Sequence, residues 1–61
     1  LSPKQELLLG LIRDHGSLAP LEIRELLGVS KQGAMNLINP LLEFGLIEKR
    51  GTRKTGRYFL T

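Results

Sequence analysis

Residues 20–37 read PLEIRELLGVSKQGAMNL. Within them Ile23 and Leu27 are four residues apart, which places both side chains on one face of a short helix. Gly28 suits the turn that would end this helix, and Ser30 is a preferred N-cap residue for a second one. The sequence therefore predicts two helices joined by a tight turn, spanning about residues 20–27 and 31–44.

The residues around this turn predict how the two helices pack. Helices that meet at a steep angle need a glycine at the turn and apolar residues at fixed offsets, as in the helix-turn-helix motif. Val29 is expected to fill the junction, and Ala34 and Leu37 are expected to pack the second helix onto the first. Arg24 stands where such pairs usually carry a small residue, so looser or rotated packing is expected there.

Outward from this motif, helical periodicity continues in both directions. Ser2 followed by Pro3 and Gln5 is typical of a capped helix start, and a leucine stripe predicts a helix over about 3–15 that ends near Gly16. Ser17-Leu18 is expected to be a short extended link and a minimal strand. In the helix predicted over about 31–44, Pro40 predicts a kink or an early end. The inner faces of the two later helices are predicted to hold Ile23, Leu26 and Leu27, and Ala34, Leu37, Ile38, Leu41 and Leu42.

The C-terminal stretch 46–61 predicts a β-hairpin. Two short segments flank a six-residue loop, 51–56, that begins and ends with glycine. Residues 49–61 carry five basic side chains and no acid, or +5, while the remaining residues carry four basic and six acidic ones, or −2, which together give the net charge of +3. A basic hairpin on a slightly acidic body favours binding to a polyanion.

Composition limits the function further. A chain of 61 residues is expected to form a single domain, α+β and mainly α, and its start at Leu1 is expected to mark a segment of a longer protein. With no cysteine and one histidine, no metal site and no cofactor are predicted. The glutamates lack a nucleophile or metal partner, and the loop GTRKTG lacks the spacing of a P-loop, so no catalytic residue is predicted. We expect a protein that is not an enzyme.

Taken together, LEIRELLGVSKQGAMNLINPLLEFGLIEKR and the following GTRKTGRYFL resemble a winged helix-turn-helix domain over nearly the whole chain. The run LLEFGLI, residues 41–47, is similar to the recognition-helix exit of MarR, ArsR and DeoR regulators. The hairpin also resembles C-terminal winged helices of Fic-type and of RecG-related or AlbA-domain proteins. The resemblance implies a three-helix core with a two-stranded C-terminal β-hairpin wing that binds double-stranded DNA as part of a transcriptional regulator.

The resemblance also implies which residues contact DNA, with the third helix in the major groove and the wing on the phosphate backbone. Gln32 and Asn36 are four residues apart, so both amides could reach base edges, and amides pair well with adenine. If all five wing cations neutralise phosphates, the log–log salt slope of binding is about −4.5. The predicted helix residues are Ser30, Lys31, Gln32, Gly33, Asn36 and Asn39, and the predicted wing residues are Thr52, Arg53, Lys54, Thr55 and Arg57.

Two alternatives stay open at this stage. The third helix has Lys31 as its one basic residue, which favours a protein-interaction or auxiliary winged helix attached to a larger enzyme, of Fic or RecG-related type. Binding to structured RNA is the other alternative, because a basic wing can follow either kind of phosphate backbone. For the DNA-binding reading we expect a homodimer or a partner domain in the same polypeptide, no membrane association, and a cytoplasmic, nucleoid-associated location.

Overall fold

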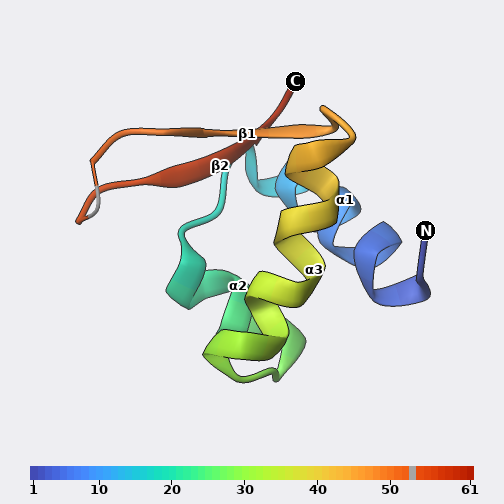
Figure 1. Cartoon of the computed structure of the whole chain (residues 1–61). Helices are drawn as coiled ribbons and strands as arrows, with labels where there is room; N and C mark the ends of the chain where they lie inside the picture. Colours follow the sequence, from blue (N-terminus) through green and yellow to red (C-terminus); the bar gives the residue numbers. More distant parts are fainter. Residues whose placement is uncertain (53) are drawn as a thin grey trace.

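A computed structural model gives the fold and describes residues 1–52 and 54–61. Three helices precede a two-stranded antiparallel hairpin, whose loop end projects away from the helices (Figure 1). The predicted element order and the mainly helical α+β class are confirmed. The elements are α1 (Pro3–His15), α2 (Pro20–Leu27), α3 (Lys31–Glu43), β1 (Ile47–Arg50) and β2 (Arg57–Leu60).

Local side-chain caps explain why each helix begins where it does. The Ser2 hydroxyl accepts a hydrogen bond from the Gln5 N–H at 3.2 Å, and the Gln5 side chain accepts one from the Ser2 N–H at 2.9 Å, which is the predicted capping box. Ser30 Oγ accepts from the Gly33 N–H at 3.1 Å at the start of α3. At α2 the N-cap residue is Ala19, whose N–H donates to the Glu22 carboxylate instead. Each start is therefore specified within four residues of sequence.

The helix α3 continues through Pro40 and ends at Glu43, so the expected early end does not occur. Proline removes one donor, which leaves the Asn36 carbonyl without its helical partner, but Asn36 is exposed and water can bond to that oxygen. Beyond the proline, Leu41 is fully buried and the Phe44 N–H donates to the Pro40 carbonyl at 2.9 Å. Packing and this last turn together outweigh the local cost of Pro40.

The core lies where the three helices meet the base of the hairpin. Ile23 of α2 is buried as predicted, whereas Leu26 is 49% exposed, so its assignment to the inner face is wrong. One helix step of about 100° separates the direction of Leu27, which is half-buried, from that of Leu26. The buried side chains that form the core are Leu8, Ile12, Leu18, Ile23, Ala34, Ile38, Leu41, Ile47 and Tyr58.

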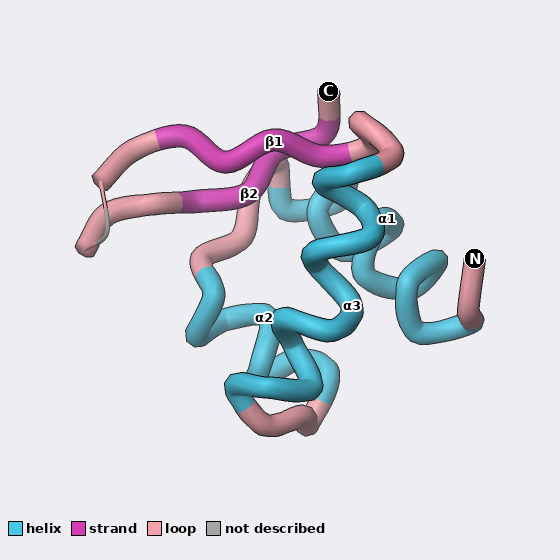
Figure 2. The backbone as a smooth tube through the Cα atoms, in the orientation of Figure 1, coloured by secondary structure: helices cyan, strands magenta, loops and turns pink. Residues whose placement is uncertain are grey.

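The hairpin is attached to the helices by a single β-bridge to the link between α1 and α2, which Figure 2 draws as a loop. Leu18, in the link between α1 and α2, exchanges two backbone hydrogen bonds with Tyr58 of β2, at 3.1 and 2.8 Å. On its other edge β2 pairs with β1 in the register Ile47↔Leu60 to Arg50↔Arg57. The predicted extended link at Ser17-Leu18 is thus confirmed, and it fixes the direction in which the hairpin leaves the body.

Across residues 1–52 and 54–61, none of the helices has the length and apolar character that crossing a membrane requires.

Candidate nucleic-acid interface

The outer face of α3, which we define by Gln32, Asn36 and Asn39, points away from the core. All three side chains are exposed, while Ala34 and Ile38 on the opposite face are buried. Gln32 Nε2 donates a hydrogen bond to Asn36 Oδ1 at 3.0 Å. This bond fixes the orientation of both amides and leaves Gln32 Oε1 and Asn36 Nδ2 without a partner among the described residues. The predicted pair is therefore brought together, with the Gln32 Oε1 acceptor and the Asn36 Nδ2 donor available to a ligand.

At the N-terminal end of α3 the predicted residues are part of the helix cap. Ser30 and Lys31 are exposed, and Ser30 Oγ already accepts the Gly33 N–H. Gly33 is half-buried, and a Cβ at this position would lie 3.4 Å from Ser30 Oγ and from Val29 Cβ. A Cβ at Gly33 would thus make ordinary van der Waals contacts with the cap, and the fold itself does not require glycine there.

Two glycines and two threonines shape the wing loop, residues 51–56. Gly51 has φ +102°, and a Cβ there would lie 2.8 Å from the Thr55 carbonyl oxygen. A Cβ at Gly56 would lie 2.6 Å from the Thr52 carbonyl oxygen, so only glycine fits this close crossing. The Thr55 N–H donates to Thr52 Oγ1 at 3.2 Å, and the two hydroxyls lie 2.9 Å apart. The predicted threonines therefore hold the loop in shape. Arg53, also predicted, lies outside the described residues.

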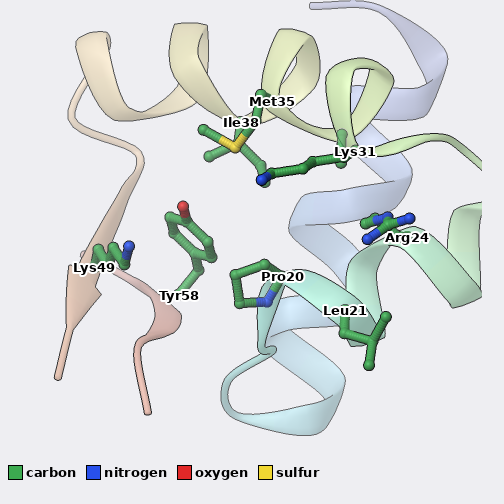
Figure 3. A pocket seen from close by; sticks show the side chains of 9 residues that line it. Pro20, Leu21, Arg24, Lys31, Met35, Ile38, Lys49 and Tyr58 are labelled. Atoms are coloured by element: carbon green, nitrogen blue, oxygen red, sulfur yellow. The ribbon is translucent and has the colours of Figure 1, made fainter. Parts of the chain in front are cut away.

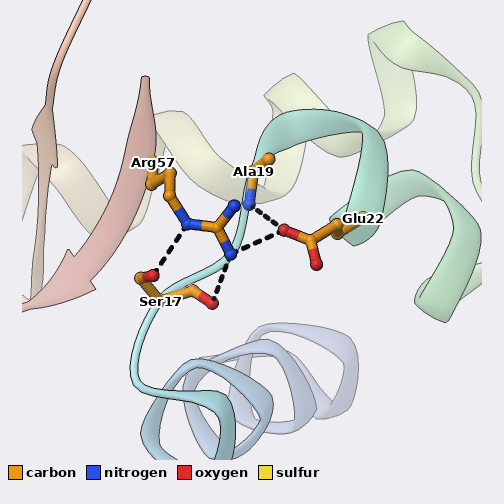
Figure 4. A network of polar contacts seen from close by, with 4 residues as sticks. All are labelled: Ser17, Ala19, Glu22 and Arg57. Atoms are coloured by element: carbon orange, nitrogen blue, oxygen red, sulfur yellow. Dashed lines mark hydrogen bonds and ion pairs between the residues drawn. The ribbon is translucent and has the colours of Figure 1, made fainter. Parts of the chain in front are cut away.

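Arg57, at the start of β2, is bonded to the body of the domain (Figure 4). Its Nε donates to Ser17 Oγ at 2.8 Å, and its Nη2 donates to the Ser17 carbonyl at 3.2 Å and pairs with Glu22 Oε1 at 2.8 Å. The same Glu22 oxygen accepts the Ala19 N–H at 2.9 Å. That backbone bond, with the charge of Arg57 added, holds the pKa of Glu22 below its ordinary value of 4.5.

The remaining wing cations differ in their surroundings. Arg50 forms an ion pair with Glu48 and places its guanidinium carbon 5.0 Å from the centre of the Phe59 ring. Lys49 lies on the opposite face of β1, with Nζ 5.9 Å from the centre of the Tyr58 ring. Lys54 is exposed on the loop and makes no ion pair with any described residue. Charge counting along the sequence could not separate these cases, because the pairing of Arg57 joins residues 35 or more positions apart.

A groove of about 670 Å³ opens between α3 and the hairpin (Figure 3). Three basic side chains from three elements line it: Arg24 of α2, Lys31 of α3 and Lys49 of β1. No acidic residue of the described chain is among its lining residues. We call this feature the basic groove. Sequence patterns did not predict Arg24 or Lys49 at this groove; the one sign was that Arg24 replaces the small residue expected in a helix-turn-helix motif.

The chain can be compared with known proteins by fold and by family model. No curated protein matches the chain. Among solved structures, a MarR family protein from Bacillus stearothermophilus superposes with a TM-score of 0.90 at 18% identity, covering 100% of this chain and 44% of that one. MarR from E. coli in its reduced form gives 0.89 at 22% identity, with coverage of 100% and 47%.

RV1404 from Mycobacterium tuberculosis also gives a TM-score of 0.89 at 22% identity, with coverage of 100% and 44%. The chain thus spans less than half the length of each of these three proteins. At these identities the structures establish the fold, and they agree with the predicted winged helix. The family model described as the MarR family matches residues 1–57 of the 61, and the chain therefore belongs to the MarR family.

Proposed function

We propose that this domain is the DNA-binding module of a transcriptional regulator, with α3 in the major groove and the hairpin wing on the phosphate backbone. The observation that carries the proposal is the outer face of α3, where the hydrogen-bonded Gln32–Asn36 pair is exposed on a domain that also carries a basic hairpin. Membership of the MarR family and the winged-helix fold support it.

The outer face of α3 supplies base recognition in this proposal. An acceptor and a donor side by side match the N6 amino group and N7 of adenine in the major groove. Gln32 Oε1 and Asn36 Nδ2 provide that combination, and their mutual bond removes much of the rotamer freedom that binding would otherwise have to restrict. Ser30, Lys31, Gly33 and Asn39 flank the pair and contact the backbone or adjacent bases.

The wing supplies affinity. Lys54 and Arg53 neutralise phosphates, and Thr52 and Thr55 hold the loop that presents them. Arg57 acts differently from the other predicted wing residues: its guanidinium is bonded to Ser17 and Glu22, so it sets the direction of the wing as a positioning residue.

The working form of the protein in this proposal is a pair of such modules, because a single one reads only a few base pairs. Leu1 and Leu7, which are 60% and 53% exposed on and beside α1, offer apolar surface to a second copy or to a partner domain. No cofactor and no catalytic residue take part. A protein that binds the bacterial chromosome in this way is cytoplasmic and nucleoid-associated.

The decisive experiment titrates the protein with duplex DNA, duplex RNA and single strands of one length at two salt concentrations. We expect the tightest binding to duplex DNA. For each phosphate contact, the logarithm of the association constant should fall by about 0.9 when the salt concentration rises tenfold. Equal binding to RNA would favour the RNA-binding alternative. Absence of binding to every nucleic acid at low salt would refute the proposal and leave the protein-interaction alternative.

A further inference from the structure

The basic groove brings together three cations that the sequence separates. Arg24, Lys31 and Lys49 come from α2, α3 and β1, and in Figure 3 they surround one opening, into which the Lys31 amine extends. Lys49 is held there because its stem crosses Gly56, where a Cβ would lie 2.7 Å from Lys49 Cε. Like charges gathered around one concavity repel one another unless an anion lies between them.

Arg24 carries a second sign of a missing partner. Its Nε is buried and has no hydrogen-bond partner among the described residues. A buried guanidinium N–H that has left water without gaining an acceptor is costly, and native structures rarely keep one without a reason. An oxyanion in the groove would neutralise the local charge, and a shift of the Arg24 side chain toward it would give this N–H an acceptor.

The rest of the lining indicates the size and kind of that anion. Pro20, Met35, Ile38 and Tyr58 form an apolar floor beneath the three cations. A nucleotide of a DNA strand has this combination, since its phosphate is anionic and its deoxyribose is largely apolar. The groove lies between α3 and the hairpin, so a strand that passes from the helix in the major groove to the wing crosses it.

We propose that the backbone of one DNA strand runs along the basic groove, with Arg24, Lys31 and Lys49 each contacting a phosphate and the apolar floor against the adjoining sugars. This inference rests on the proposed function and adds two residues to it, Arg24 and Lys49. Phosphates held between α3 and the wing fix the register of both elements on the duplex, because phosphate contacts position a protein rather than specify sequence.

The test replaces each new ligand by a neutral side chain of similar length, Arg24→Gln and Lys49→Met. Each change should reduce the salt slope by about 0.9, which corresponds to about eightfold weaker binding at about 0.1 M salt if the proteins bind equally at about 1 M. Lys49→Arg should restore the slope. Lys4→Met, on exposed α1, is the matched control and should leave it unchanged. Thermal unfolding of each variant checks that Arg24→Gln remains folded, and the exposed Lys49 provides the test if it does not.

A second part of the experiment locates the phosphate that Lys49 contacts. A preferred duplex is prepared with single phosphates replaced, one at a time, by uncharged methylphosphonates. One replacement should weaken binding of the wild-type protein about eightfold and should not weaken binding of Lys49→Met further, because the lost charge and the lost ligand belong to one contact. Lys54→Ala should respond to different positions on the duplex.

The outcomes separate this inference from the function on which it rests. If Lys54→Ala flattens the slope while Arg24→Gln and Lys49→Met do not, DNA binding stands and the groove is not a phosphate site. If inorganic phosphate at constant ionic strength binds the free protein through these residues while the duplex slope is unchanged in both variants, the groove takes a small anion and the proposal is overturned. If the wild-type protein binds no duplex, the proposed function itself fails.

Discussion

The outer face of α3 and the hairpin wing differ in how their side chains are prepared for a ligand. On α3, two neutral amides are paired with each other and point away from the core. On the hairpin, charge is abundant in the sequence, yet Arg57 is bonded to Ser17 and Glu22, Arg50 pairs with Glu48, and Lys49 turns toward the basic groove. Local sequence therefore predicts available amides better than available charges, since a charge finds partners at long range.

The largest expected effect concerns the packing of the hairpin into the core, on which the contrast between the wing and α3 depends. Tyr58 is 2% exposed and its backbone bonds to Leu18, so Tyr58→Ala should lower the free energy of unfolding by about 3 kcal/mol. Phe59→Ala, at the half-buried neighbouring position, should cost only about 1 kcal/mol. Urea unfolding followed by circular dichroism measures both. Equal losses would show that the wing is not part of the core.

The next largest effect concerns the wing tip. The double variant Arg53→Ala, Lys54→Ala should flatten the salt slope by about 1.8 and weaken binding to all duplexes alike, about sixtyfold at about 0.1 M salt. Fluorescence anisotropy at several salt concentrations gives the slope, with Lys4→Ala as the control on α1. Unchanged binding by the double variant would contradict the role of the wing as the affinity element.

For variants of α3, the expected change is in which DNA sequence the protein prefers. Asn36→Ala should reduce discrimination at one base pair by about 1–3 kcal/mol and leave the salt slope unchanged. Gln32→Ala should affect the same base pair, and the double variant should lose little more, because the two amides act through one hydrogen bond. Selection from a random duplex pool measures the preference. Losses that simply add, at different base pairs, would show that the amides read independently.

The smallest effect concerns the anchor of Arg57. Because the pKa of Glu22 is lowered in the folded protein, the carboxylate contributes stability above its ordinary pKa of 4.5, and this is lost as pH falls through the lowered value. Between about pH 5 and pH 3, the melting temperature of Glu22→Gln should therefore fall less than that of the wild-type protein. Glu25→Gln is the control on the same helix, and a matching change in that variant would argue against the Glu22–Arg57 pair as the cause.

Much of the fold was predictable because its signals are local. Ser2 and Ser30 cap the helices that they were expected to cap, and the glycines of the wing loop lie at its close crossing. The errors came from non-local packing. Leu26 is exposed although its spacing suits an inner face, and α3 passes Pro40 because buried Leu41 holds its last turn.

The candidate interface was predictable in part for the same reason. Helical spacing brings Gln32 and Asn36 together, since four residues span about one turn. No spacing rule places Arg24 and Lys49 on one groove, or Arg57 beside Ser17, which is 40 residues earlier in the chain. Those juxtapositions follow from the Leu18–Tyr58 bridge, which sets the hairpin beside the link between α1 and α2.

By itself, then, the sequence determined the order and ends of the helices, the hairpin and its glycine loop, because caps, periodicity and turn geometry act over a few residues. The tertiary structure decided which cations remain available to a ligand, because ion pairing depends on side chains that meet only after folding. It also decided that three of those cations share one groove, because that requires α2, α3 and β1 to converge.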